Sequence, residues 1–146
     1  MTMYRIALIF ILCGVFTNAL AYGKCTQADA KAAEEKSSTI ANWSQLHIAF
    51  NRFKSCDDGA IGEGYSDSVV RLLTEQWDGI SELQKAFSTS QSFEIFILRH
   101  IDELMTPSQL TKIESNATNR CPSDAKEFCR KILGRIGEIR STAIKP

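Results

Sequence analysis

The sequence predicts an all-α protein: a compact bundle of five to seven helices around one core, stapled by disulfides. Apolar residues recur at steps of three and four along most of the chain, which is the period of an amphipathic helix. No window alternates between apolar and polar residues as a half-buried strand does. Four cysteines follow a leader-like N-terminus, a combination typical of exported, disulfide-bonded proteins.

The N-terminus has the three-part layout of a secretory signal peptide. Arg5 precedes an apolar run at residues 6–16, and a small-residue triplet follows at 19–21. We expect cleavage after Ala21, which leaves residues 22–146 as a single helical domain of roughly 125 residues. The apolar run is shorter than the roughly 20 residues of a membrane span. We therefore predict a periplasmic or secreted product that leaves the membrane after cleavage, with a retained anchor as the alternative.

The charge balance excludes a strongly basic or acidic protein. The chain has 17 basic and 17 acidic residues, and cleavage of the leader removes Arg5. The mature chain therefore has one more acidic than basic residue. Such a balance gives no general attraction to nucleic acid or to an anionic lipid surface.

The expected helices follow one another along the chain. Residues 25–37 are rich in Ala, Glu and Lys, which are strong helix formers. Single apolar stripes then mark residues 43–56, 68–77 and 92–105. Capping-box patterns open three further helices, at 81–84, 106–109 and 124–127. Pro107 strengthens the second of these starts because proline is favoured in a first helical turn.

Two disulfides are predicted for the mature chain. Cys13 lies in the leader and is expected to leave with it, and the cysteines that remain are Cys25, Cys56, Cys121 and Cys129. An even count in an exported chain indicates disulfides rather than free thiols. None of them forms a Cys-x-x-Cys pair, so we predict neither a zinc site nor a redox motif.

Helix geometry favours the disulfides Cys25–Cys56 and Cys121–Cys129 over the two crossed pairings. One straight helix over residues 26–56 would hold its ends roughly 45 Å apart. Cys121 and Cys129 are too close in sequence to bond to cysteines at both ends of such a helix. A break at residues 37–42 would instead fold two antiparallel arms and bring the first pair together. The second pair needs the chain to fold back over a helix start, because bridged Cα atoms lie within about 7 Å. A helix that began at Pro122 would prevent this bridge, so the crossed pairings stay open.

The segment "CDDGAIGEGYSD", residues 56–67, is predicted to be a loop between two helices. We expect three of its residues to hold the loop in shape. Asp57 ends the first helix, Gly59 takes a backbone conformation that other residues avoid, and Asp67 caps the second helix.

The other prominent residues of this segment have no evident local task. Glu63 stands between two glycines, and Tyr65 lies beside them. Loops on rigid scaffolds often carry binding residues, so we predict that Glu63, Tyr65 and Asp58 contact a protein partner.

Two chemical interpretations of the same segment are weaker. Its acidic spacing does not match a calcium loop of the EF-hand type, so we predict no metal and no cofactor. Glu63 and Asp67 could act as the carboxylate pair of a glycosidase, which keeps a small secreted hydrolase as a third hypothesis. His47 and His100 are interpreted as structural or surface histidines, so we assign no catalytic residue and predict no enzyme.

The block "CDDGAIGEGYSDSVVRLL", together with "FEIFILRHID" and "RCP", resembles a block of small exported bacterial helical proteins of unsettled function. In general layout the chain also resembles the periplasmic immunity proteins of interbacterial toxin systems. That resemblance implies an exported binding protein without chemistry of its own, which neutralises a protein partner such as a secreted lytic toxin.

The alternative function is a carrier of small apolar ligands, comparable in type to the insect odorant-binding proteins. Those are also exported helical proteins with disulfides, although the spacing from Cys121 to Cys129 fits their pattern poorly. Six aromatic side chains could line a helical cavity: Phe50, Phe53, Phe87, Phe93, Phe96 and Phe128. Such a set more often forms a packed core than a cavity wall.

Overall fold

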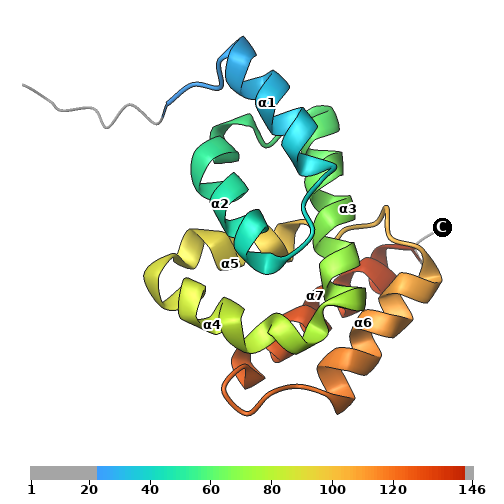
Figure 1. Cartoon of the computed structure of the whole chain (residues 1–146). Coiled ribbons are helices and arrows are strands. Elements are labelled where there is room, and N and C mark those ends of the chain that lie inside the picture. The colour runs from blue at the N-terminus through green and yellow to red at the C-terminus, as the bar shows by residue number, and fades with distance from the viewer. Residues whose placement is uncertain (1–22, 144–146) are drawn as a thin grey trace, which may run out of the picture.

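The computed structural model describes residues 23–143, which fold into seven α-helices and two short 3-10 helices without a strand (Figure 1). The α-helices are α1 (Gln27–Ser37), α2 (Trp43–Phe53), α3 (Gly59–Glu75), α4 (Ile80–Thr89), α5 (Gln91–Arg99), α6 (Pro107–Asn119) and α7 (Lys126–Ala143). The 3-10 helices are η1 (Lys54–Cys56) and η2 (Trp77–Gly79). The predicted all-α class and number of helices are confirmed. The predicted signal peptide, residues 1–21, lies outside the described residues.

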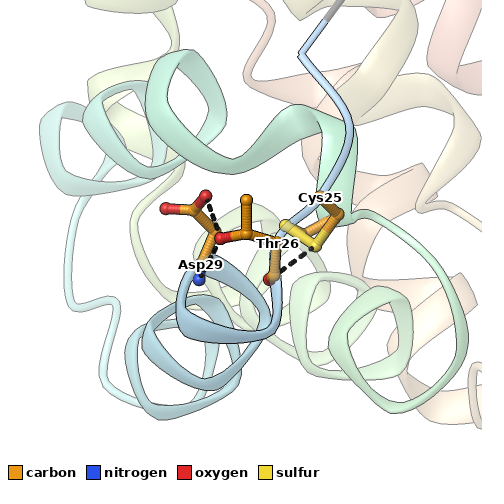
Figure 2. Close-up of a disulfide and its surroundings, with 4 residues drawn as sticks. Cys25, Thr26 and Asp29 are labelled. Atoms are coloured by element: carbon orange, nitrogen blue, oxygen red, sulfur yellow. Dashed lines mark hydrogen bonds between the residues drawn. A yellow bond between two sulfur atoms is a disulfide. The ribbon is translucent and has the colours of Figure 1, made fainter.

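The N-terminal hairpin forms as its caps and its cysteines predict. Thr26 caps α1 by accepting a hydrogen bond from the backbone N–H of Asp29 at 3.1 Å (Figure 2). Asn42 caps α2 in the same way. The chain turns back between these two helices, and the disulfide Cys25–Cys56 closes the open end with Cα atoms 4.9 Å apart. The predicted first pairing is confirmed.

The second disulfide joins Cys121 to Cys129 across the start of α7, with Cα atoms 6.2 Å apart. The chain folds back before α7, where the backbone N–H of Ala125 donates to the carbonyl of Pro122 at 3.0 Å. The predicted pairing is confirmed, but the predicted cap at Asp124 is wrong. Because α7 begins at Lys126, Asp124 lies one residue too early to cap it, and its carboxylate accepts a hydrogen bond from Ser81 instead.

The prediction of a loop at residues 56–67 is wrong, because most of this segment is helix. Only Asp57 and Asp58 connect η1 to α3, and Asp58 caps α3 by accepting from the N–H of Gly59 at 2.8 Å. Gly59 has a φ of +51°, so the expectation of an unusual backbone at this glycine is confirmed. Asp67 lies well inside α3, so its predicted role as a cap is wrong.

Close packing of α1 on α3 explains how a glycine-rich segment becomes a helix. A Cβ atom at Gly64 would overlap the Oγ and Cβ atoms of Ser37 on α1. The Ser68 hydroxyl, one turn further along, donates to the carbonyl of Ser37 at 2.6 Å. Each glycine weakens an isolated helix by about 1 kcal/mol, and the contact between the two helices offsets this cost.

The helix α3 occupies the centre of the molecule and contacts the α1–α2 hairpin and α6 (Figure 1). The core around it is rich in aromatic side chains whose rings touch: Phe50 lies 5.1 Å from Phe93 and 5.0 Å from Phe96, centroid to centroid. Both tryptophans are buried with their indole N–H groups satisfied, since Trp43 donates to Gln76 O and Trp77 to Arg120 O, each at 2.9 Å.

Two further contacts hold the C-terminal helix. Arg140 on α7 makes a two-pronged ion pair with Glu114 on α6, with nitrogen–oxygen distances of 2.6 and 2.8 Å. Lys131 of α7 pairs with Glu94 of α5 at 2.8 Å. Across residues 23–143, no helix combines the length and the apolar character that a membrane crossing requires.

Candidate functional site

A hollow of about 140 Å³ lies between α3 and the connection from α5 to α6. We call it the acidic hollow, and it is lined by Glu63, Ser66, Asp67, Val70, Asp102, Leu104, Met105 and Gln109. Three of these eight side chains are carboxylates, and Leu104 at the edge is 70% exposed. The acidic hollow therefore combines negative charge with an exposed apolar side chain.

Because residues 59–75 form the helix α3, the side chains of the predicted contact residues point in different directions. Glu63 and Asp67 are exposed, lie one turn apart and both line the acidic hollow. Tyr65 lies between them in sequence and faces the core, where it is fully buried with its ring edge-on to Phe96 at 5.2 Å. The prediction that Tyr65 contacts a partner is therefore wrong.

Asp57 directly follows η1 and ends it, as predicted, and Asp58 has a structural role at the start of α3. Asp58 is exposed, but it caps α3 and is not one of the residues that line the acidic hollow. The Asp57 side chain is only 4% exposed, because it turns inward beneath the start of α3, where it accepts a hydrogen bond from Arg99 and lies 3.2 Å from Nε2 of His100.

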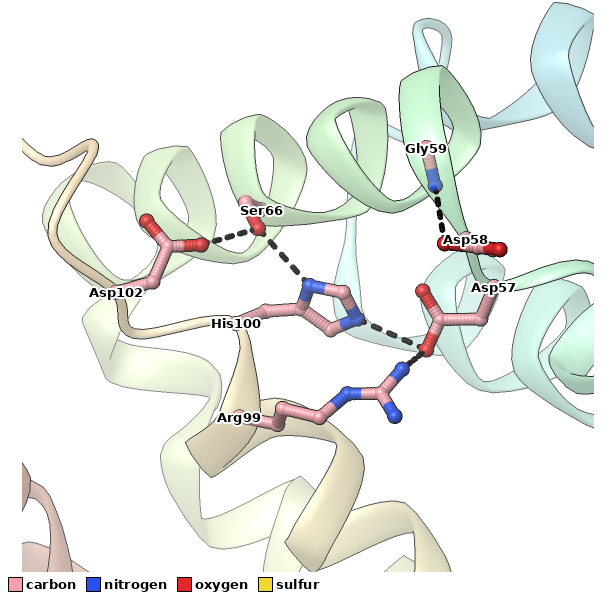
Figure 3. Close-up of polar contacts among 7 residues, drawn as sticks. All are labelled: Asp57, Asp58, Gly59, Ser66, Arg99, His100 and Asp102. Atoms are coloured by element: carbon pink, nitrogen blue, oxygen red, sulfur yellow. Dashed lines mark hydrogen bonds and ion pairs between the residues drawn. The ribbon is translucent and has the colours of Figure 1, made fainter.

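Beneath the acidic hollow lies a buried chain of polar contacts, which we call the polar relay (Figure 3). The hydroxyl of Ser66 donates to Oδ2 of Asp102 at 2.7 Å and lies 2.9 Å from Nδ1 of His100. On the other side of the ring, Nε2 of His100 lies 3.2 Å from Oδ2 of Asp57. Arg99 binds the same oxygen of Asp57.

The polar relay was not predicted from the sequence. Its members come from the η1–α3 connection, from α3, from the end of α5 and from the α5–α6 connection, and the interpretation of His100 considered only its own helix. The single available signal was the pattern "RHID", which places a base and an acid together at a helix end. Nothing in the spacing indicated that Ser66 and Asp57 would meet them.

Burial sets the protonation states of the two buried aromatic titratable groups. Desolvation, together with the smaller effect of the Arg99 charge, lowers the pKa of His100 to about 4, while Asp102 opposes the shift. Desolvation also raises the pKa of Tyr65 to about 12. At neutral pH both side chains are therefore uncharged. The hydroxyl of Tyr65 has no hydrogen-bond partner among the described residues.

The polar relay places a hydroxyl, an imidazole and a carboxylate in a row, the order used in nucleophilic catalysis. Its surroundings do not suit acyl transfer. Ser66 lies in the middle of α3, where the backbone N–H groups are committed to the helix and cannot form an oxyanion hole. The carboxylates around Ser66 would repel a developing oxyanion. The arrangement suits recognition of a cation better than acyl transfer.

The carboxylate pair of the hydrolase hypothesis, Glu63 and Asp67, is brought together on one face of α3. Both side chains are exposed, whereas a glycosidase shields its acid from water. Within residues 23–143, no group of three or more His, Cys, Asp or Glu side chains is arranged to hold a metal ion.

The aromatic residues that could have lined a carrier cavity fill the interior instead. Five of the six are buried, Phe87 packs partly buried against them, and its ring lies 4.8 Å from that of Phe128. A separate hollow of about 540 Å³ lies between α6, α7 and the α5–α6 connection. Its apolar side chains include Met105, Leu110 and Ile139, with Glu103, Arg135 and Glu138 around them.

The fold and the hollow together define an all-α, disulfide-bonded protein with an acidic hollow beside its central helix. No protein-family model, curated protein or solved structure was found to match this chain. The resemblance to exported bacterial proteins and to immunity proteins therefore stays a prediction.

Proposed function

We propose that the protein is an exported binding protein that holds a protein partner through the acidic hollow and accepts a Lys or Arg side chain of that partner. The main support is that Glu63, Asp67 and Asp102 all line one hollow. None of the three belongs to the ion pairs formed among the described residues. A basic side chain inserted there would form charge-assisted hydrogen bonds in a partly desolvated setting.

The edge of the acidic hollow supports a protein partner over a small cation. Leu104 is 70% exposed beside the carboxylates, and a large apolar side chain with so much exposed surface gains by contact with an apolar group. The partner that fits carries a basic side chain next to an apolar depression. In its specific form, the proposal is an immunity or inhibitor protein that neutralises a secreted lytic toxin, as the resemblance in layout implies.

The test is capture of the partner from periplasm or secretion fluid, followed by titration of variants. We expect Glu63→Ala and Asp67→Ala each to weaken binding by about 1 kcal/mol or more, roughly fivefold in Kd. The matched control is Glu75→Ala, which removes an exposed carboxylate of the same helix outside the acidic hollow. Equal affinity of the wild type and the Glu63→Ala, Asp67→Ala double variant would refute the proposed site.

The carrier hypothesis is supported by one observation only, the hollow of about 540 Å³ with Met105, Leu110 and Ile139 in its wall. Its test is titration with an apolar fluorescent probe. Carrier function predicts saturable binding that Leu110→Asp abolishes and Glu63→Ala leaves unchanged.

A further inference from the structure

We propose that Ser66 and His100 connect the acidic hollow to the ion pair between the buried Asp57 and the exposed Arg99, so that a cation bound at Asp102 changes which ring nitrogen of His100 carries hydrogen. The cation in this inference rests on the proposed function. The internal arrangement of hydrogens does not depend on the cation: it rests on the geometry of the polar relay and on a neutral His100 ring.

The polar relay has three contacts and only two hydrogens to fill them. The contacts are Asp102 to Ser66 at 2.7 Å, Ser66 to His100 at 2.9 Å and His100 to Asp57 at 3.2 Å. The hydroxyl of Ser66 supplies one hydrogen, and a neutral imidazole supplies one more. Because burial keeps His100 uncharged at pH 7, one of the three contacts must lack a hydrogen.

In the free protein the hydrogens follow the strongest acceptor near Ser66. A carboxylate is a better acceptor than a neutral ring nitrogen, so Ser66 donates to Asp102. The oxygen of Ser66 then accepts from Nδ1 of His100, which therefore carries the ring hydrogen. The contact without a hydrogen is the one between Nε2 of His100 and Asp57.

A cation bound at Asp102 is expected to reverse these hydrogen positions. It competes for the lone pairs of the carboxylate, so that Nδ1 of His100 becomes the better acceptor for Ser66. The ring hydrogen then moves to Nε2 and is donated to Asp57. That carboxylate gains from the change, because its Oδ2 atom then accepts a hydrogen bond from Nε2, where before it faced a ring nitrogen without a hydrogen.

The groups that face His100 allow the change without a change in net charge. They are Arg99 on its own helix, Asp57 from the η1–α3 connection, Asp102 from the α5–α6 connection, and the ring of Tyr65 on α3 at 6.0 Å. Tyr65 is uncharged at neutral pH because burial raises its pKa. The hydrogen shift therefore transmits occupancy of the acidic hollow to the disulfide end of the hairpin, since Asp57 directly follows Cys56.

The hydrogen arrangement is tested by long-range ¹H–¹⁵N NMR of the His100 ring at pH 7. The parent protein for this test carries His47→Gln, so that His100 is its one histidine. We expect the Nδ1–H tautomer in the parent protein and the Nε2–H tautomer in Asp102→Ala. Asp67→Ala is the matched control: it lines the same hollow but makes no hydrogen bond to Ser66, so it should keep Nδ1–H. One tautomer in all three proteins, or an imidazolium in the parent protein, overturns the relay.

The effect of a ligand is tested with ethylguanidinium as the cation. Saturation should convert the parent protein from Nδ1–H to Nε2–H, whereas Ser66→Ala should show Nε2–H with or without the cation. Movement of the Glu63 and Asp67 amide signals without a change of tautomer overturns the relay and leaves the cation site intact. No movement of these signals contradicts the cation site, while the Asp102→Ala comparison still decides the hydrogen arrangement.

Discussion

At the scale of single residues, helical periodicity decides which side chains of the segment 56–67 can meet a partner. Residues four apart share a face of a helix, whereas a residue midway between them points to the other side. Glu63 and Asp67 therefore reach the acidic hollow together, and Tyr65 enters the core. A loop would have imposed no such separation.

Tyr65 is expected to act through stability and not through binding. Tyr65→Ala removes a fully buried ring and should lower the free energy of unfolding by about 3–5 kcal/mol. Tyr65→Phe keeps the ring and removes a hydroxyl without a described partner, so its stability should equal or exceed that of the wild type. Urea unfolding of both variants checks this. A Tyr65→Phe loss above about 2 kcal/mol would show that the hydroxyl is bonded in solution.

His100 is expected to make stability fall as pH falls. Its folded pKa of about 4 lies below the usual value of 6.5, so the unfolded state binds a proton first on acidification. The contribution is fully present above pH 6.5, is lost between pH 6.5 and 4, and amounts to something on the order of 3 kcal/mol.

The measurement is urea unfolding of the wild type and His100→Gln at several pH values between 7 and 4. The difference between the two proteins isolates the histidine from the carboxylates that titrate in the same range. Equal pH dependence in both proteins would contradict a neutral, buried imidazole at position 100.

At the scale of the elements, the packing of α1 on α3 depends on the absence of a side chain at Gly64. Gly64→Ala adds helix propensity but forces a methyl group into Ser37, so we expect a net loss of about 1–3 kcal/mol. Gly134→Ala on α7 is the matched control, because a Cβ atom there meets no neighbour within 4 Å. It should raise stability by up to about 1 kcal/mol. Similar effects of the two substitutions, measured by urea unfolding, would refute close packing at Gly64.

At the scale of the whole molecule, the two disulfides should differ in their contributions to stability. The loop closed by Cys25–Cys56 spans 31 residues and that closed by Cys121–Cys129 spans 8. Loop entropy predicts losses of roughly 3.7 and roughly 2.5 kcal/mol when each pair is replaced by serines. Thermal unfolding of the two double variants checks the order. The larger loss for the Cys121–Cys129 pair would show that entropy of the unfolded chain is not the controlling effect.

Part of the candidate site could be predicted from the sequence. Glu63 and Asp67 were noted in the sequence as two carboxylates in a glycine-rich segment, and the structure places both at one hollow. Asp102, Leu104 and Ser66 were not predicted, because their role depends on where the α5–α6 connection crosses α3. That crossing is a long-range property with no local signal in the chain.

The helical class and the break between α1 and α2 follow from the sequence itself, because apolar period and caps are local quantities. Chain reach favoured the observed disulfide pairings, but the structure was needed to exclude the crossed ones. Only the tertiary structure decided that the glycine-rich segment is helical. Its glycines argue for a loop by propensity, and the contact with Ser37 reverses that preference. The polar relay has the same origin: Asp57, Ser66 and His100 are far apart in sequence, and the packing of α3 and α5 brings them together.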